Sequence, residues 1–202
     1  MKTGEAIKEL SLFLSEAKSP HILSGGVVAA IHRNEPRASG VVEFSLLDRQ
    51  KVLSWISMKQ LIVKGLNFPR GGIESAAPIE VAPVISTQVD DTMQVGFDFV
   101  FNNPFFHDAY KRCPQVELEL EGMKILAFDA EFYFLYRLHL LGVDGKQRYL
   151  EQDDLFQMAE RENFLQWPFI ISEIERQKIK LPKDLNFLPT SPRRLLKGLK
   201  LE

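Results

Sequence analysis

The chain has little cysteine and no long apolar run. Cys113 is the single cysteine among 202 residues, which excludes an internal disulfide framework and a cysteine-based zinc site. This usage is typical of the reducing cytoplasm, where we expect the protein to work. No stretch is apolar enough to span a bilayer, and charges interrupt the N-terminal segment too often for a signal peptide, so we expect no membrane contact.

Neither sign of charge is in excess. Lysine and arginine number 25 against 27 aspartates and glutamates, which gives a formal net charge of -2. Such a balance provides no general attraction to nucleic acid or to an anionic membrane, so any such contact would need a local patch. The hydrophobic content of 45% is that of an ordinary globular protein, and there is no internal repeat or low-complexity tract.

The hydrophobic pattern predicts both helices and strands. Asp48 is the expected N-cap of one helix. Helices are predicted over 3–17, 27–31, 49–58, 104–112 and 167–180, and strands over 21–23, 41–47, 61–66, 79–85 and 93–101, with a hairpin over 116–128.

Ser24, Gly25 and Gly26 stand between the first strand and the short helix over 27–31. Two adjacent glycines there let the backbone come close to a ligand, and the N–H groups of the helix start then point at it. An anion is the ligand that such a turn favours, and a phosphate is the obvious candidate.

The order of motifs along residues 20–160 resembles the minimal nucleotidyltransferase superfamily, in particular proteins of toxin-antitoxin and abortive-infection systems. The matching residues are Gly25 and Gly26, then His32, then Arg37-Ala38-Ser39, then Val41-Val42-Glu43, Asp98, Asp129 with Glu131, Arg137-Leu138, and Asp153-Asp154 as the cap of the next helix. The resemblance implies an α/β (α+β) fold with a small mixed sheet flanked by helices and a helical C-terminal region. It divides the chain into a packing helix (1–19), a nucleotidyltransferase-like domain (20–162) and a helical extension with a basic tail (163–202).

The acidic motif departs from the family pattern at Val41. Family members have Asp-x-Asp on this strand, which places two carboxylates on one face to hold magnesium against a triphosphate. Here Val41 replaces the first carboxylate and Glu43 the second. The resemblance implies that Glu43 and Asp98 are the catalytic residues and the ligands of Mg²⁺ or Mn²⁺, in a degenerate site. From the residues alone, a solvent-facing position, or an ion pair with an arginine such as Arg37, explains Asp98 as well as the catalytic role does.

The resemblance also implies which residues contact the nucleotide. They are Ser24, Gly25, Gly26, Arg37 and Arg137. Arg137 stands where the family has lysine, and it keeps the positive charge although the two side chains are not equivalent.

Three functions follow as hypotheses. The first is a nucleotide-binding or regulatory module with impaired catalysis. The second is an active metal-dependent enzyme that moves a nucleotide from a nucleoside triphosphate to RNA or protein. The third is a non-enzymatic partner in a toxin-antitoxin-like pair. At the C-terminal end, Arg193, Arg194, Lys197 and Lys200 alternate with leucines, which favours an amphipathic helix that either docks a partner or RNA, or packs on its own domain.

Overall fold

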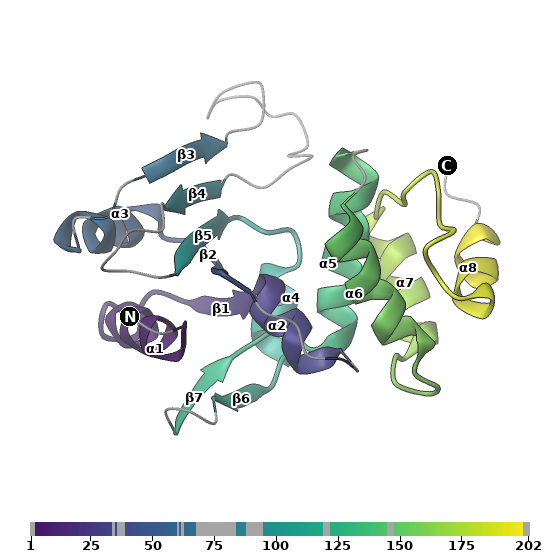
Figure 1. The fold of residues 1–202 in the computed structure, drawn as a ribbon, viewed down its shortest axis with the longest axis horizontal. Helices are drawn as coiled ribbons and strands as arrows, with labels where there is room; N and C mark the ends of the chain where they lie inside the picture. The colour runs from purple at the N-terminus through teal and green to yellow at the C-terminus, as the bar shows by residue number, and fades with distance from the viewer. Residues whose placement is uncertain are drawn as a thin grey trace. The chain divides into compact units, whose positions relative to one another are not determined.

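The computed structural model describes residues 3–33, 35, 39–59, 61, 63–67, 84–87, 95–118, 122–144 and 148–199. The chain forms two compact units (Figure 1). The first comprises Met1–Val28 and Ala38–Phe128, and the second comprises Ala29–Arg37 and Asp129–Glu202. The predicted boundaries after residues 19 and 162 remain predictions. None of the described helices has the length and apolarity needed to cross a membrane.

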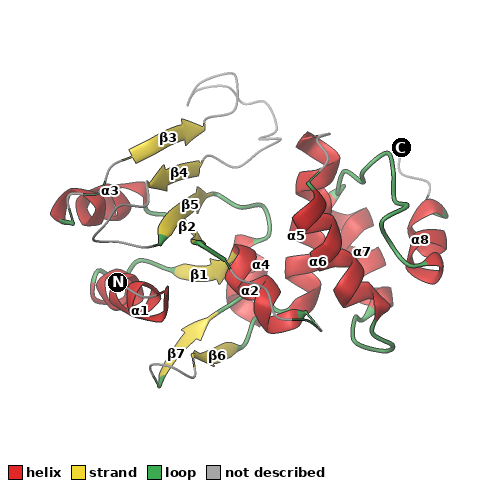
Figure 2. Ribbon diagram, viewed as in Figure 1, coloured by secondary structure: helices red, strands yellow, loops and turns green. Residues whose placement is uncertain are grey.

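The first unit contains the strands, as Figure 2 shows. They are β1 (His21–Ser24), β2 (Val41–Leu46), β3 (Val63–Asn67), β4 (Val84–Thr87), β5 (Gly96–Phe101), β6 (Gln115–Leu118) and β7 (Met123–Leu126). Its helices are α1 (Thr3–Glu16), α3 (Arg49–Met58) and α4 (Phe106–Arg112), together with the first half of α2 (Gly25–His32).

Five of these strands form one mixed sheet in the order β1-β2-β5-β4-β3. Strands β2 and β5 are parallel, and the other neighbours are antiparallel. The remaining two strands, β6 and β7, form a separate hairpin. This arrangement confirms the predicted mixed sheet with flanking helices.

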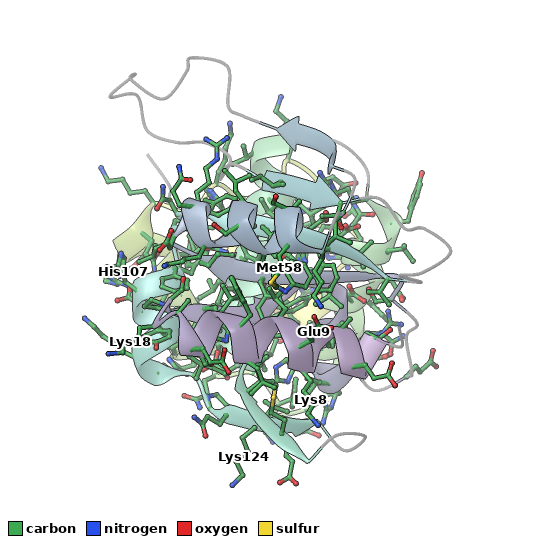
Figure 3. All side chains as sticks on the ribbon, turned by 90° about the vertical axis from the view of Figure 1, so that its left-hand side faces the viewer. Lys8, Glu9, Lys18, Met58, His107 and Lys124 are labelled. Carbon is green, nitrogen blue, oxygen red and sulfur yellow. The ribbon has the colours of Figure 1, made fainter. Side chains whose placement is uncertain are left out.

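Helix α3 covers one face of the sheet because its apolar residues meet the aromatic side chains of β5. The Trp55 ring lies edge-on to Phe97, with centroids 5.1 Å apart, and to Phe99, at 6.1 Å. Asp48 caps this helix as predicted, since its side chain accepts a hydrogen bond from the Lys51 backbone N–H. Figure 3 shows α1 and α3 side by side, and Glu9 of α1 forms an ion pair with Lys59.

The second unit is helical in its described part (Figure 2). It contains the end of α2 and four more helices, which are α5 (Ala130–Asp144), α6 (Tyr149–Glu160), α7 (Trp167–Gln177) and α8 (Thr190–Lys197). Asp129 caps α5 by accepting a hydrogen bond from the Phe132 N–H at 2.8 Å. The predicted helical C-terminal region is therefore confirmed.

The prediction that Asp153 and Asp154 cap a helix is wrong. Helix α6 begins at Tyr149, so both aspartates lie inside it. They bind Arg33 instead of the backbone N–H groups of a helix start.

Candidate functional site

Glu43 and Asp98 lie opposite one another on adjacent strands. The parallel pairing of β2 and β5 places Glu43 in register with Asp98, and Val41 in register with Gly96. Residues in register on neighbouring strands point to the same face of a sheet, so the two carboxylates share a face. That face is opposite to the one that Phe97 and Phe99 present to α3, because side chains alternate along a strand. Both carboxylate residues are half-buried.

The glycine turn begins beside this pair. Ser24, the last residue of β1, is in register with Glu43 on the other side of β2. Gly25 follows directly and has a φ of 75°, in the left-handed region that glycine adopts without steric cost. Gly26 lies in the first turn of α2. Ser24, Glu43 and Asp98 therefore form a row across three strands, and the glycine turn continues from the end of that row.

Buried polar side chains support the row from within the first unit. The Ser24 hydroxyl donates a hydrogen bond to the Glu43 carbonyl at 3.3 Å and shares another with the Ser45 hydroxyl at 3.2 Å. The Asn103 amide donates to the Ser45 hydroxyl at 3.1 Å. All three side chains are at most 3% exposed. The Ser24 hydroxyl is thus committed to this chain of hydrogen bonds, which links β1, β2 and the segment after β5.

Sequence reasoning missed Ser45 and Asn103. For Ser45 a signal existed, because Glu43 and Ser45 are the two polar residues at alternating positions of an apolar strand. Asn103 has no such signal, since an asparagine after a strand is typical of an ordinary turn.

The donor set suits a hard divalent cation. Carboxylate oxygens are the side-chain ligands that Mg²⁺ prefers, and two of them commonly suffice when phosphate and water complete the coordination. Val41 is 39% exposed at the start of β2. Within the described ranges no three histidine, cysteine, aspartate or glutamate residues are grouped closely enough to hold a metal.

The two other predicted nucleotide contacts are Arg37 and Arg137. Arg37 is not among the described residues. Arg137 belongs to the second unit, where it is 6% exposed. Its guanidinium lies over the rings of Tyr133 and Tyr136, at 5.4 Å and 5.1 Å from their centroids. The roles of Arg37 and Arg137 remain predictions.

A buried ion pair in the second unit was also missed. Arg33, directly after α2, donates to Asp154 at 2.6 Å and to Asp153 at 2.7 Å. The Asp154 side chain is completely buried and also accepts a hydrogen bond from the Tyr133 hydroxyl at 3.0 Å. Arg161 donates to the carbonyl of His32, the last residue of α2, at 2.8 Å. These contacts hold the C-terminal end of α2, while its N-terminal end begins at the glycine turn.

Comparison with solved structures finds similar folds, among them two with TM-scores above 0.5. One is the lincomycin-bound lincosamide antibiotic adenylyltransferase LnuA, with a TM-score of 0.51, 12% identity and coverage of 82% of this chain and 99% of that chain. The other is the antibiotic-resistance factor ANT(2'')-Ia, with a TM-score of 0.54, 10% identity and coverage of 88% and 95%. No protein-family model matches the chain, and no curated protein matches its sequence.

Proposed function

We propose that this chain, which has the nucleotidyltransferase fold, binds a nucleoside triphosphate together with a divalent cation, and that its transfer chemistry is impaired. The likeness to known structures confirms the fold that the sequence predicts. At 10–12% identity it shows the fold alone. The observation that carries the proposal is the register of Glu43 with Asp98, directly beside Ser24 and the glycine turn.

Each part of this row has a role in the proposal. Glu43 and Asp98 would hold Mg²⁺ or Mn²⁺ by their carboxylate oxygens. The ion would neutralise charge on the phosphates to which it is bound. The backbone at Gly25 and Gly26 would lie close to the phosphates, since neither glycine has a side chain that would obstruct them. Ser24 would act through its position, because its hydroxyl is already bonded to Glu43 and Ser45.

Val41 is the reason to expect impaired chemistry. Two metal ions clamping both the attacking and the leaving oxygen require more anionic ligands than a single binding ion. An apolar side chain at the start of β2 supplies no such ligand. Binding of one cation with its nucleotide needs less, and the two retained carboxylates suit that task.

Calorimetric titration tests the binding. The purified protein is titrated with ATP, GTP, CTP and UTP, each with and without Mn²⁺. We expect at least one nucleotide to bind only when the metal is present, and the affinity to fall tenfold or more in Glu43→Gln and Asp98→Asn. Glu117→Gln is the matched control, since Glu117 is an exposed strand carboxylate in the β6–β7 hairpin. Absence of binding by all four nucleotides would contradict the proposal.

An active transferase is the second candidate, and the retention of two carboxylates in register favours it. Incubation with α-labelled nucleotide and Mn²⁺, alone and with total RNA or protein extract, separates the two candidates. Transfer of label by the wild type and not by Asp98→Asn would show that the protein is an active transferase and would contradict the impaired module. Metal-dependent binding without transfer supports the impaired module.

A further inference from the structure

The C-terminal part of the second unit concentrates positive charge. Residues 178–202 contain seven lysines and arginines and two acidic residues, in a chain whose formal net charge is -2. Six of these cations lie in the described segment 178–197, which we call the basic segment: Lys178, Lys180, Lys183, Arg193, Arg194 and Lys197. Five are exposed, and Arg193 is half-buried. Figure 1 shows this segment as the irregular chain that leads into α8, and as α8 itself.

The charge of the basic segment is not neutralised within the described residues. None of its six cations forms an ion pair with a described carboxylate. Arg193 donates to neutral oxygens, those of Asn186 at 3.1 Å and Thr190 at 3.3 Å. Asp184, the acidic residue of the basic segment, accepts a hydrogen bond from the Asn186 N–H at 2.8 Å. By contrast, Arg176 just before the segment is paired with Glu173 at 2.6 Å.

The apolar side of α8 is already used. Pro192 and Leu196 are buried in the unit, which leaves Leu195, at 42% exposure, as the one exposed apolar residue of the helix. A helix that enters a bilayer surface needs a free apolar face, and a protein interface needs buried apolar or aromatic anchors. On the described basic segment, Leu195 is the one large apolar residue that is exposed, which is too little for either kind of contact. Unpaired cations without such anchors suit a regular row of phosphates.

We propose that the basic segment binds the phosphodiester backbone of a nucleic acid without sequence preference. The observation behind it is a run of six cations that lack a carboxylate partner among the described residues, three of which lie on α8, a helix with Pro192 and Leu196 buried. This inference is independent of nucleotide binding at Glu43 and Asp98, because all six cations lie in the second unit.

Fluorescence anisotropy with labelled 20-nucleotide RNA and DNA strands measures this binding between 50 and 300 mM salt. Each phosphate contact contributes about 0.7 to the slope of log affinity against log salt for single strands, so six contacts give a slope of about 4. The triple variant Lys183→Gln, Arg194→Gln, Lys197→Gln should lower the slope by about 2 and the affinity at 100 mM salt by tenfold or more.

The matched control removes three exposed cations from the first unit, as Lys18→Gln, Lys111→Gln, Lys124→Gln. Lys18 and Lys124 are labelled in Figure 3. This variant has the same net charge as the test variant and should bind as the wild type does. Equal loss in both variants, no binding to either strand at 50 mM salt, or binding only to anionic vesicles would each overturn the proposal. A preference for RNA over DNA, or the reverse, would identify which nucleic acid the basic segment binds.

Discussion

At the scale of single residues, Val41 is the position at which the proposed metal site can be tested most directly. Its side chain is 39% exposed, in register with Gly96 and two residues before Glu43 on the same face of β2. Val41→Asp would add a third carboxylate at little desolvation cost, and we expect metal-dependent nucleotide affinity to rise about tenfold, or ~1.4 kcal/mol. Val41→Asn is the control, because it has the same shape without the charge. Equal affinities of the two variants in calorimetry would show that no ligand position exists there.

Asp153 and Asp154 contact the same arginine in different surroundings. The Asp154 side chain is 0% exposed and the Asp153 side chain 47%. Asp154→Asn removes one of the two carboxylates that neutralise Arg33, and it does so in a buried environment. We expect this variant to lower the free energy of unfolding by about 3 kcal/mol. Asp153→Asn should cost less than about 1 kcal/mol, since water screens an exposed pair. Urea denaturation measures both, and similar losses would mean that burial does not set the strength of the contact.

At the scale of elements, Ser45 links strands β1 and β2 to Asn103. Ser45→Ala leaves the Asn103 amide and the Ser24 hydroxyl with one partner fewer in a buried place, at a cost of about 1–3 kcal/mol. We expect nucleotide affinity to fall several-fold as well, because Ser24 positions the glycine turn. Thr87→Val is the control, since Thr87 is a buried hydroxyl of the same sheet that accepts from the Phe97 N–H at 2.9 Å. It should lower stability similarly while nucleotide affinity is kept. Loss of affinity in both variants would assign the effect to general destabilisation.

Helix α5 lies against the chain that leads to α8, and Gly142 allows this approach. A Cβ atom at Gly142 would be 2.0 Å from the Lys180 carbonyl oxygen, so the backbone itself would have to move. Gly142→Ala should cost about 1–3 kcal/mol of stability, the usual range for overpacking. At Gly198 a Cβ would be 3.4 Å from the nearest atom, and Gly198→Ala should change stability by less than about 0.5 kcal/mol. Thermal or urea unfolding compares the two, and a fully stable Gly142→Ala would contradict the tight contact.

Local sequence signals predicted the elements well and the contacts between them poorly. The Asp48 cap depends on residues within four positions, and it is confirmed. Strand alternation likewise predicts which face Glu43 and Asp98 occupy, but the pairing of β2 with β5 joins residues 55 positions apart. The error at Asp153 and Asp154 has the same cause. Two acidic residues early in a helix look like a cap unless the distant Arg33 is known to bind them.

At the scale of the whole molecule, each unit contains a histidine whose pKa is lowered by burial. Burial lowers the pKa of His21 in the first unit, although its Nδ1–H donates to the Ser19 carbonyl, which opposes the shift. Burial, and then the charge of Lys180, lower the pKa of His139 in the second unit. His139 Nδ1 also accepts a long hydrogen bond, 3.4 Å, from the Lys180 N–H, which a protonated ring could not accept.

These shifts make the stability depend on pH with a definite sign. Because each histidine binds its proton less readily in the folded state, the unfolded state takes up more protons below its ordinary pKa of about 6.5. The contribution of neutral His21 and His139 is therefore fully present above that pH and decreases as the pH falls toward their folded values. Urea denaturation at pH 7.5, 6.5 and 5.5 should show a lower free energy of unfolding at each step. The decrease should become smaller in the double variant His21→Gln, His139→Gln. A decrease of the same size in that variant would mean that other groups carry the pH dependence.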